Sequence, residues 1–498
     1  MTRRMRIDDL TDLVVPSQPA LSPDGTRIAY VVRTLDADLD RNVDELWLAE
    51  TGGGPGRRLT AGPKDVAPAW SPDGTRVAFV RDGQLAVLTA DGGEAETLTD
   101  LSLGAGAPVW SPDGRRLAFS ALVDDGTSGP LVADRVDYQA DGAGRYGAVR
   151  SQLHVLDLAT RDVRRLTDDS ESAGQPVWSP DGTTLAFTRR VGDDSDLRSR
   201  TAVHLLAVDD SKAEPRAVAL TDGLAATVDY TADGSALLVI GWPGEPKGHL
   251  RLLLVPLDGG ETVELSGSLD RNVMPGATAY PGGRPQEHDG RIYFCVRDRG
   301  CTSLWSVALD GTGARPVLAG DDRVVGGLSV AAGNAAITLA TGTSYGEIAV
   351  VDLSTGDSTV LTEHGSALKD VQLFPREERT FTISDGTQVQ AWLVRDPDRS
   401  GPTPVLLDIH GGPHNAWNGA ADEVHLYHQE LAARGWTVLL VNPRGSDGYG
   451  EAFFDGAVGA WGVADSKDFL EPLDQLVTEG LADPDRLAVA GYSYGGFM

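Results

Sequence analysis

The stretch S-P-D-G-T-R-V-A-F, residues 71–79, decides the fold of the first part of this chain. Similar stretches occur at residues 22–30, 111–119 and 179–187, and a weaker copy starts at Thr231. Proline presets φ and glycine is free to adopt positive φ, so the first four residues of each copy favour a turn. The alternating residues that follow favour a strand that buries every second side chain. The aspartates of successive copies are 49, 40, 68 and 52 residues apart, close to the length of one four-stranded propeller blade.

A second pattern recurs between these copies: a strand, a polar turn, and a strand that ends in Leu-Thr or a similar pair. It occurs at residues 45–60, 84–99, 152–167, 203–221, 250–266, 303–318 and 347–362. Four to eight blades close a ring, so the seven occurrences predict an all-β seven-bladed propeller. A propeller alone says little about activity, because this architecture is found in binding proteins and enzymes alike.

Two further features belong to the repeats. Tryptophans at positions 70, 110 and 178 each precede an S-P-D, and this regular placement favours packing between blades over ligand stacking. The third blade carries an insertion at residues 123–150, rich in Gly, Asp and Arg. Insertions in repeat proteins map to one face, so this one is either part of a binding face or a solvated loop.

After Leu361 the pattern changes to longer strands separated by helices. Strands are expected at residues 379–384, 388–394, 404–409, 436–441 and 486–490, and helices at 426–434 and 465–479. This alternation is typical of a parallel sheet covered on both faces. The predicted domains are an N-terminal segment (1–19) that is a candidate to pack on the second domain, a propeller (20–362), a linker (363–378) and an incomplete α/β-hydrolase domain (379–498).

The last predicted strand runs into G-x-S-x-G, with Gly491, Ser493 and Gly495. In a nucleophile elbow, glycines at these two positions allow a strained turn from strand to helix that exposes the serine hydroxyl. Residues 342–346 also fit the pattern, but Ser344 precedes a strand, whereas an elbow leads into a helix. Ser493 is therefore the candidate nucleophile.

A second candidate element, H-G-G-P at residues 410–413, directly follows the strand at 404–409. In hydrolases of this architecture, a glycine-rich loop after the third strand donates a backbone N–H to the oxyanion. A simple turn would explain the glycines equally well, but the position of the loop before Ser493 favours the oxyanion role.

These motifs resemble those of the prolyl oligopeptidase family of serine peptidases, in that family's order. The resemblance rests on residues 410–414, 442–446 with 448–450, 461–462 before Asp465 and Asp468, and 491–498. The H-G-G-P form and residues 134–144 resemble the acylaminoacyl-peptidase branch. The resemblance implies hydrolysis of short peptides through an acyl-enzyme on Ser493, with a propeller that excludes folded proteins.

The resemblance also implies roles for individual residues. The backbone N–H groups of Tyr494 and Gly412 would form the oxyanion hole, and Arg444 would be either a structural clamp or a substrate ligand. His410 and His414 are not expected to be the base, since the triad of these hydrolases runs Ser, then Asp or Glu, then His. The residues expected to shape the site are His410, Gly411, Pro413, Asn442, Arg444 and Gly445.

The sequence ends five residues after Ser493. We therefore expect it to be an inactive fragment of a longer enzyme whose catalytic Asp and His lie beyond residue 498. The alternatives are a non-catalytic propeller binding module with a remnant hydrolase segment, and a carboxylesterase, which would use the same machinery. Within the family the first choice is an acylaminoacyl-peptidase, and a dipeptidyl aminopeptidase or a general oligopeptidase comes behind it. A dipeptidyl aminopeptidase needs paired carboxylates for the substrate amine, and Glu377 and Glu378 lie in the predicted linker instead, which counts only mildly against that activity.

The composition of the chain limits the classes of partner that it is expected to bind. The net charge of -30 and pI near 4.6 disfavour binding to nucleic acid and to anionic membranes. No signal peptide is visible, apolar runs are short, and Cys295 and Cys301 favour free thiols, which together predict a cytoplasmic protein. No metal or cofactor signature stands out. The expected partners are short peptide substrates, and a homo-oligomer is left open.

Overall fold

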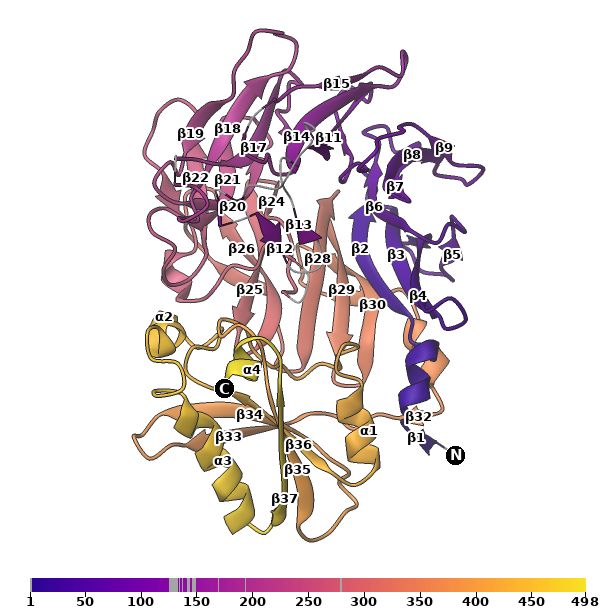
Figure 1. The fold of residues 1–498 in the computed structure, drawn as a ribbon. Helices are drawn as coiled ribbons and strands as arrows, with labels where there is room; N and C mark the ends of the chain where they lie inside the picture. Colours follow the sequence, from indigo (N-terminus) through magenta and orange to yellow (C-terminus); the bar gives the residue numbers. More distant parts are fainter. Residues whose placement is uncertain are drawn as a thin grey trace.

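The computed structural model describes residues 2–124, 133, 135–136, 138–140, 144–145, 149–168, 170–192, 194–277 and 280–498. It shows a ring of small sheets above a layered α/β domain (Figure 1). Most of the predicted insertion at 123–150 lies outside the described residues, so its two interpretations remain predictions.

Seven groups of four strands form the ring, which confirms the seven-bladed propeller. Blades one and two comprise β2 (Val15–Leu21), β3 (Arg27–Asp36), β4 (Arg41–Glu50), β5 (Arg57–Arg58), β6 (Asp65–Trp70), β7 (Arg76–Arg81), β8 (Gln84–Thr89) and β9 (Glu96–Thr97). Blades three and four comprise β10 (Val109–Trp110), β11 (Arg116–Asp124), β14 (Val149–Asp157), β15 (Val163–Arg165), β16 (Val177–Trp178), β17 (Thr184–Arg190), β18 (Thr201–Ala207) and β19 (Arg216–Ala219), with the pair β12 (Gln139–Ala140) and β13 (Gly144–Arg145) inserted in blade three.

The remaining blades are built in the same way. Blade five comprises β20 (Leu224–Tyr230), β21 (Ala236–Trp242), β22 (Arg251–Pro256) and β23 (Val263–Glu264), and is followed by the 3-10 helix η2 (Gly267–Leu269). Blades six and seven comprise β24 (Gln286–His288), β25 (Arg291–Asp298), β26 (Cys301–Ala308), β27 (Arg315–Leu318), β28 (Arg323–Ala331), β29 (Asn334–Thr341), β30 (Ser344–Asp352) and β31 (Ser358–Val360).

The turn of each S-P-D-G repeat is held by its aspartate. In blade two, Asp73 accepts hydrogen bonds from the Ser71 hydroxyl at 2.6 Å and from the Thr75 amide at 3.0 Å. The Ser71 bond and those from Thr75 lower the pKa of Asp73 to about 2. The ionised carboxylate therefore stabilises the turn.

The arginine of the repeat joins neighbouring blades. The Arg76 guanidinium lies over the ring of Trp110 in the next blade, 4.8 Å from its centre, and donates a hydrogen bond to the Gly114 carbonyl oxygen at 3.2 Å. A guanidinium over an indole contributes about 0.5–2 kcal/mol. Two other joints have this form: Arg27 with Trp70, and Arg116 with Trp178. The tryptophans thus pack between blades, as their spacing predicts.

The other blades are joined differently. The inner strands β20 and β28 each form one backbone bridge to the preceding blade, Thr201 with Leu224 and Thr302 with Val324. Blade one meets blade seven through apolar side chains, and the Leu21 amide donates a hydrogen bond to the Ser329 hydroxyl at 2.9 Å. Side chains therefore close the ring.

The second domain is a five-stranded sheet in the order β33-β34-β36-β35-β37. Its strands are β33 (Glu377–Thr382), β34 (Gln388–Val394), β35 (Thr403–Ile409), β36 (Thr437–Asn442) and β37 (Ala482–Gly491). Its helices are α1 (Tyr427–Ala433), α2 (Glu451–Phe454), η4 (Asp455–Ala457), α3 (Ser466–Thr478) and α4 (Tyr494–Phe497). β35 pairs in parallel with β36 and with β37, whereas β34 pairs antiparallel with both β33 and β36. The expectation of a parallel sheet therefore holds for the pairing of three strands.

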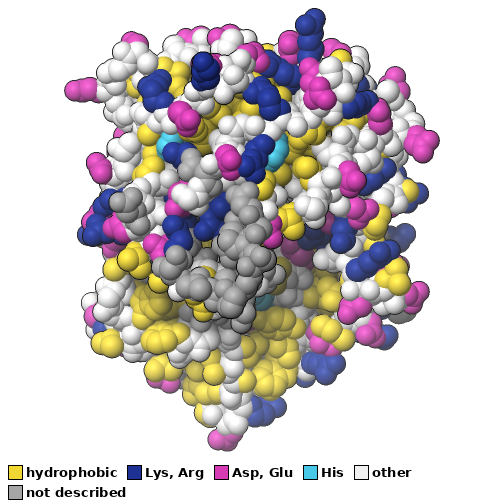
Figure 2. Space-filling view, turned by 45° about the horizontal axis from the view of Figure 1, so that its top comes forward, with side chains coloured by type: hydrophobic (Ala, Val, Ile, Leu, Met, Phe, Trp, Pro, Cys, Tyr) yellow, Lys and Arg dark blue, Asp and Glu magenta, His cyan; other side chains and the backbone are white. Residues whose placement is uncertain are grey.

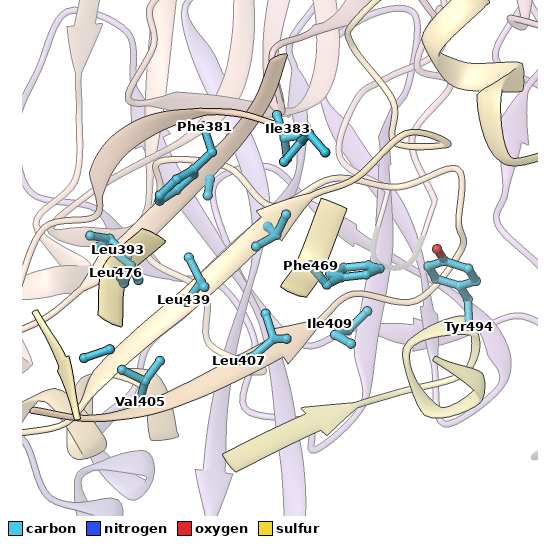
Figure 3. Packing of buried hydrophobic residues seen from close by; sticks show 14 residues of the cluster. Phe381, Ile383, Leu393, Val405, Leu407, Ile409, Leu439, Phe469, Leu476 and Tyr494 are labelled. Carbon is cyan, nitrogen blue, oxygen red and sulfur yellow. The ribbon is translucent and has the colours of Figure 1, made fainter. Parts of the chain in front are cut away.

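Buried clusters cover both faces of this sheet, one against α3 and one against α1. Figure 3 shows Tyr494, Phe469 and Ile409 side by side at the end of the sheet where β37 enters α4. Leu439 and Leu407 continue this core along the adjacent strands. The segment after the last strand is thus anchored to the core through Tyr494.

The outer side of β37 is open to solvent. The strand lies at the edge of the sheet, with Leu487 and Val489 exposed by 42% and 67%. Tyr492 and Phe497, beyond it, are also exposed. Figure 2 shows hydrophobic side chains gathered over the lower part of one face, whereas charged side chains are spread over the propeller above.

The segments between the domains pack on both. Parallel pairing joins β1 (Arg3–Arg4) to β32 (Val371–Gln372), with η1 (Ile7–Asp12) and η3 (His364–Leu368) close by. The strand β2 begins within the predicted N-terminal segment, and β33 begins within the predicted linker. Among the described residues, no helix is long and apolar enough to span a membrane.

Candidate active site

Ser493 occupies the turn between β37 and α4. Its backbone has φ 55° and ψ -115°, the positive-φ conformation that non-glycine residues avoid. Such a conformation costs about 1–3 kcal/mol and persists only where its surroundings enforce it. The hydroxyl-bearing residue is exposed, as a nucleophile elbow requires.

The two flanking glycines are needed for steric reasons. A Cβ on Gly491 would lie 2.4 Å from the carbonyl carbon of Gly495, and a Cβ on Gly495 would lie 2.1 Å from the Ile409 carbonyl oxygen. Neither contact is tolerable. The pattern G-x-S-x-G therefore reflects the close approach of β37, the first turn of α4 and the end of β35.

The glycine-rich loop lies directly against the elbow. A Cβ on Gly411 would be 3.5 Å from the Cβ of Ser493 and 3.2 Å from the carbonyl oxygen of Tyr492. Gly412 has φ 135°, a conformation open mainly to glycine. In the described part of the chain, the backbone N–H groups of Gly412 and Tyr494 donate no hydrogen bond. Both donors are thus available near the serine.

The side chain of Tyr494 fixes the position of its own backbone. The ring is buried in the core, and its hydroxyl donates a short hydrogen bond to Asp465. Burial and this bond raise the pKa of Tyr494. Asp465 also accepts the Gly462 amide at 2.7 Å. A preorganised N–H at this position needs such an anchor.

The two histidines of the loop are both held by other groups. His410 is buried; its Nδ1–H donates to the Gly411 carbonyl oxygen at 2.8 Å, so Nε2 accepts the Ser446 hydroxyl at 3.1 Å. Burial lowers the pKa of His410 to about 4. His414 donates from Nδ1 to the Gly445 carbonyl oxygen at 3.0 Å and stacks on Phe454, with ring centres 3.7 Å apart. In the described residues the Ser493 hydroxyl forms no hydrogen bond.

The loop after β36 is held in place by hydrogen bonds of Arg444 and Asn442. Arg444 donates to both oxygens of Asp468, at 2.7 and 2.8 Å, and to Asp385 at 3.0 Å. Of the two roles left open for Arg444, these contacts favour the clamp. Asn442 is fully buried and bonds both the amide and the carbonyl of Trp417, at 2.7 and 2.9 Å.

Gly445 and Pro413, two further residues expected to shape the site, lie against each other and bring the two loops into contact. A Cβ on Gly445 would lie 3.3 Å from the Cβ of Pro413 and 3.1 Å from that of Ala457. The structure thus brings the loop at 410–413, the loop at 442–450 and the elbow into one assembly.

One buried pair was missed by sequence reasoning. Arg297 on β25 and Asp447 of the hydrolase loop are both essentially inaccessible, and Arg297 Nε lies 3.9 Å from Asp447 Oδ2. The Arg297 Nη1 donates to Asn415 Oδ1 at 2.6 Å, and Asn272 Nδ2 donates to Asp447 Oδ2 at 2.9 Å. These partners are more than a hundred residues apart, so no local signal could have joined them.

Comparison with known proteins agrees with this geometry. Residues 423–498 match the model of the prolyl oligopeptidase family. The uncharacterized peptidase YuxL of Bacillus subtilis is 28% identical over 538 residues, covering 100% of this chain and 80% of that protein. Dipeptidyl-peptidase 5 of Porphyromonas gingivalis is 24% identical over 344 residues, covering 64% of this chain and 46% of that protein.

A solved structure supports the fold. Pyrococcus horikoshii acylaminoacyl peptidase superposes with a TM-score of 0.81 at 20% identity, over 98% of this chain and 75% of that chain. At this identity the likeness concerns the fold alone. Together with the family match over the elbow, these findings lead to one conclusion: residues 423–498 match the prolyl oligopeptidase family of peptidases, and the whole chain is similar to a peptidase.

Proposed function

We propose that Ser493 is the nucleophile of a serine peptidase that cleaves short peptides. The observation that carries this proposal is the contact between the strained elbow and the glycine-rich loop, with two unpaired backbone N–H donors beside it. Each donor of an oxyanion hole contributes about 3–4 kcal/mol in the transition state.

The reaction would follow the usual acyl transfer. The Ser493 oxygen attacks the peptide carbonyl carbon, its proton passes through a general base to the leaving amine, and water then hydrolyses the ester. His410 and His414 are occupied elsewhere, so we assign the base to neither. We propose Gly412 and Tyr494 as the oxyanion donors, and Arg444 as a clamp for the loop that borders them.

For the substrate we propose peptides with a blocked N-terminus, as the name acylaminoacyl peptidase states for the solved relative. The runner-up is a dipeptidyl peptidase, the activity named for the relative from Porphyromonas gingivalis. Cleavage rates on an N-acetylated peptide, a dipeptide amide with a free amine and a simple ester rank the three activities.

The first test is labelling with a fluorophosphonate probe. It uses the full-length protein that the gene encodes. We expect labelling of the wild type and of Ser344→Ala, because Ser344 lies at the start of β30 and not in an elbow. Ser493→Ala should not label. A folded wild type that fails to label would refute the proposal and favour the propeller as the functional part.

A further inference from the structure

Three possible metal ligands meet where the second domain touches the propeller, outside the elbow and the glycine-rich loop. His249 comes from the segment between β21 and β22, Asp270 follows η2, and Glu451 is the first residue of α2. One ligand atom from each lies within 4.8 Å of the other two. Figure 1 shows α2 at the boundary between the two domains.

The backbone holds the two carboxylates at this position. The Glu451 amide donates to Asp270 Oδ1 at 2.8 Å. A Cβ on Gly450 would lie 2.6 Å from Asp270 Oδ2, and a Cβ on Gly248 would lie 2.0 Å from Glu451 Oε1. Glycines therefore make room for each carboxylate from the opposite domain.

His249 is the unexplained member of the group. It is 3% exposed, and its Nε2 is buried without a hydrogen-bond partner. Its Nδ1 faces Asp270 Oδ1 at 3.8 Å, which is too long for a hydrogen bond. Its ring lies edge-on to that of Phe454, and the carboxylates of Asp447, Asp270 and Glu451 and the Arg271 guanidinium act on it electrostatically. Neither ring nitrogen of His249 has a hydrogen-bond partner among the described residues. Buried polar groups are normally satisfied, so this imidazole, with Nδ1 facing Asp270, indicates a missing ligand.

The separation of His249 from Asp270 suits a shared cation. Two donor atoms each about 2.1 Å from one metal ion lie roughly 3.0–3.8 Å apart for angles of about 90–130°. The 3.8 Å between His249 Nδ1 and Asp270 Oδ1 falls at the end of that range. The Glu451 carboxylate has a competing partner in Arg251 at 3.5 Å, but Arg251 is closer to Glu264, at 2.8 Å.

We propose that His249, Asp270 and Glu451 bind one divalent cation of the zinc or manganese class. One imidazole nitrogen with two carboxylates is a donor set for first-row transition metals, whereas magnesium prefers oxygen ligands alone. The cation would tie two propeller segments to the hydrolase loop that ends at Gly450. It would stabilise the contact between the two domains and take no part in peptide cleavage.

Calorimetric titration of the chelator-treated protein with Zn²⁺, and then with Mn²⁺ and Mg²⁺, tests the proposal. We expect one site for Zn²⁺, with affinity lowered about tenfold or more in Glu451→Gln and in Asp270→Asn. Glu264→Gln is the matched control, because it removes a neighbouring partner of Arg251 but no ligand. Zn²⁺ should raise the melting temperature of wild type and of this control only.

Three results would overturn the proposal: no saturable Zn²⁺ binding at micromolar concentrations, equal affinity in all four proteins, or preferred binding of Mg²⁺. Melting curves in excess chelator show whether each variant is folded before titration. Asp270 and Glu451 are partly exposed, so their variants are expected to fold. The test therefore needs no variant of His249, which is buried.

Discussion

Replacing Gly495 by alanine tests the steric account of the elbow. The new Cβ would lie 2.1 Å from the Ile409 carbonyl oxygen, whereas real Cβ atoms essentially never come closer than 3.0 Å. The elbow or the end of β35 must therefore move by about 0.9 Å. A misplacement of about 1 Å in an active site costs about 10²-fold in rate, and overpacking costs about 1–3 kcal/mol of stability.

The adjacent Gly496 provides a matched control. A Cβ there would have its nearest neighbour at 3.6 Å, an ordinary contact. We expect the rate of fluorophosphonate labelling to fall about 10²-fold in Gly495→Ala and to stay near wild type in Gly496→Ala. The melting temperature should fall only in Gly495→Ala. Equal labelling rates and equal melting temperatures for the two variants would refute the steric reasoning.

Other predictions concern stability, measured as urea midpoints. Arg76→Ala should lose about 1–2 kcal/mol, because one cation–π contact and one hydrogen bond between blades disappear, whereas Arg115→Ala, on the exposed turn, should change little. Asp73→Asn should lower the midpoint at neutral pH. Because the folded pKa of Asp73 is about 2, below the value of the unfolded chain, its contribution is complete above about pH 4 and is lost as the pH falls toward 2. Arg297→Ala leaves a buried carboxylate without its cation and should cost about 3–5 kcal/mol, whereas Arg299→Ala removes a half-exposed pair and should cost under about 1 kcal/mol.

Each of these predictions has a contrary outcome. Equal midpoints for Arg76→Ala and Arg115→Ala would mean that the blade joint contributes nothing measurable. A deficit in Asp73→Asn that is unchanged at pH 2 would mean that the charge is not what holds the turn. Equal losses for Arg297→Ala and Arg299→Ala would contradict the importance of burial for the interdomain pair.

Much of the architecture was predictable because the signals are local and repeated. The turn chemistry of S-P-D-G recurs at blade length, and the outer hairpins remain readable where the turn sequence has decayed. In the second domain the predicted strand at 388–394 coincides with β34, and the helix predicted at 465–479 differs from α3 by one residue at each end. Amphipathic periodicity and apolar runs carry this information.

What could not be predicted depends on contacts between distant segments. Nothing local states that β34 pairs with β36, or that the strand at 486–490 lies at the edge of the sheet and not at its centre. The pair of Arg297 and Asp447 and the group around His249 unite residues from different domains. The side chain of Tyr494 likewise has its partner, Asp465, on another element.

The arginine–tryptophan joint has a consequence for how such rings change during evolution. In each of the three joints among the first four blades, an arginine of one blade contacts a tryptophan of the next blade, so the three joints are alike. If a duplication or deletion removed a whole blade between equivalent points, Arg27 would meet Trp110 in place of Trp70, and the new seam would match. After the fourth blade, Thr184 and Tyr230 stand where arginine and tryptophan stood, so modules cannot be exchanged across that boundary without a mismatch.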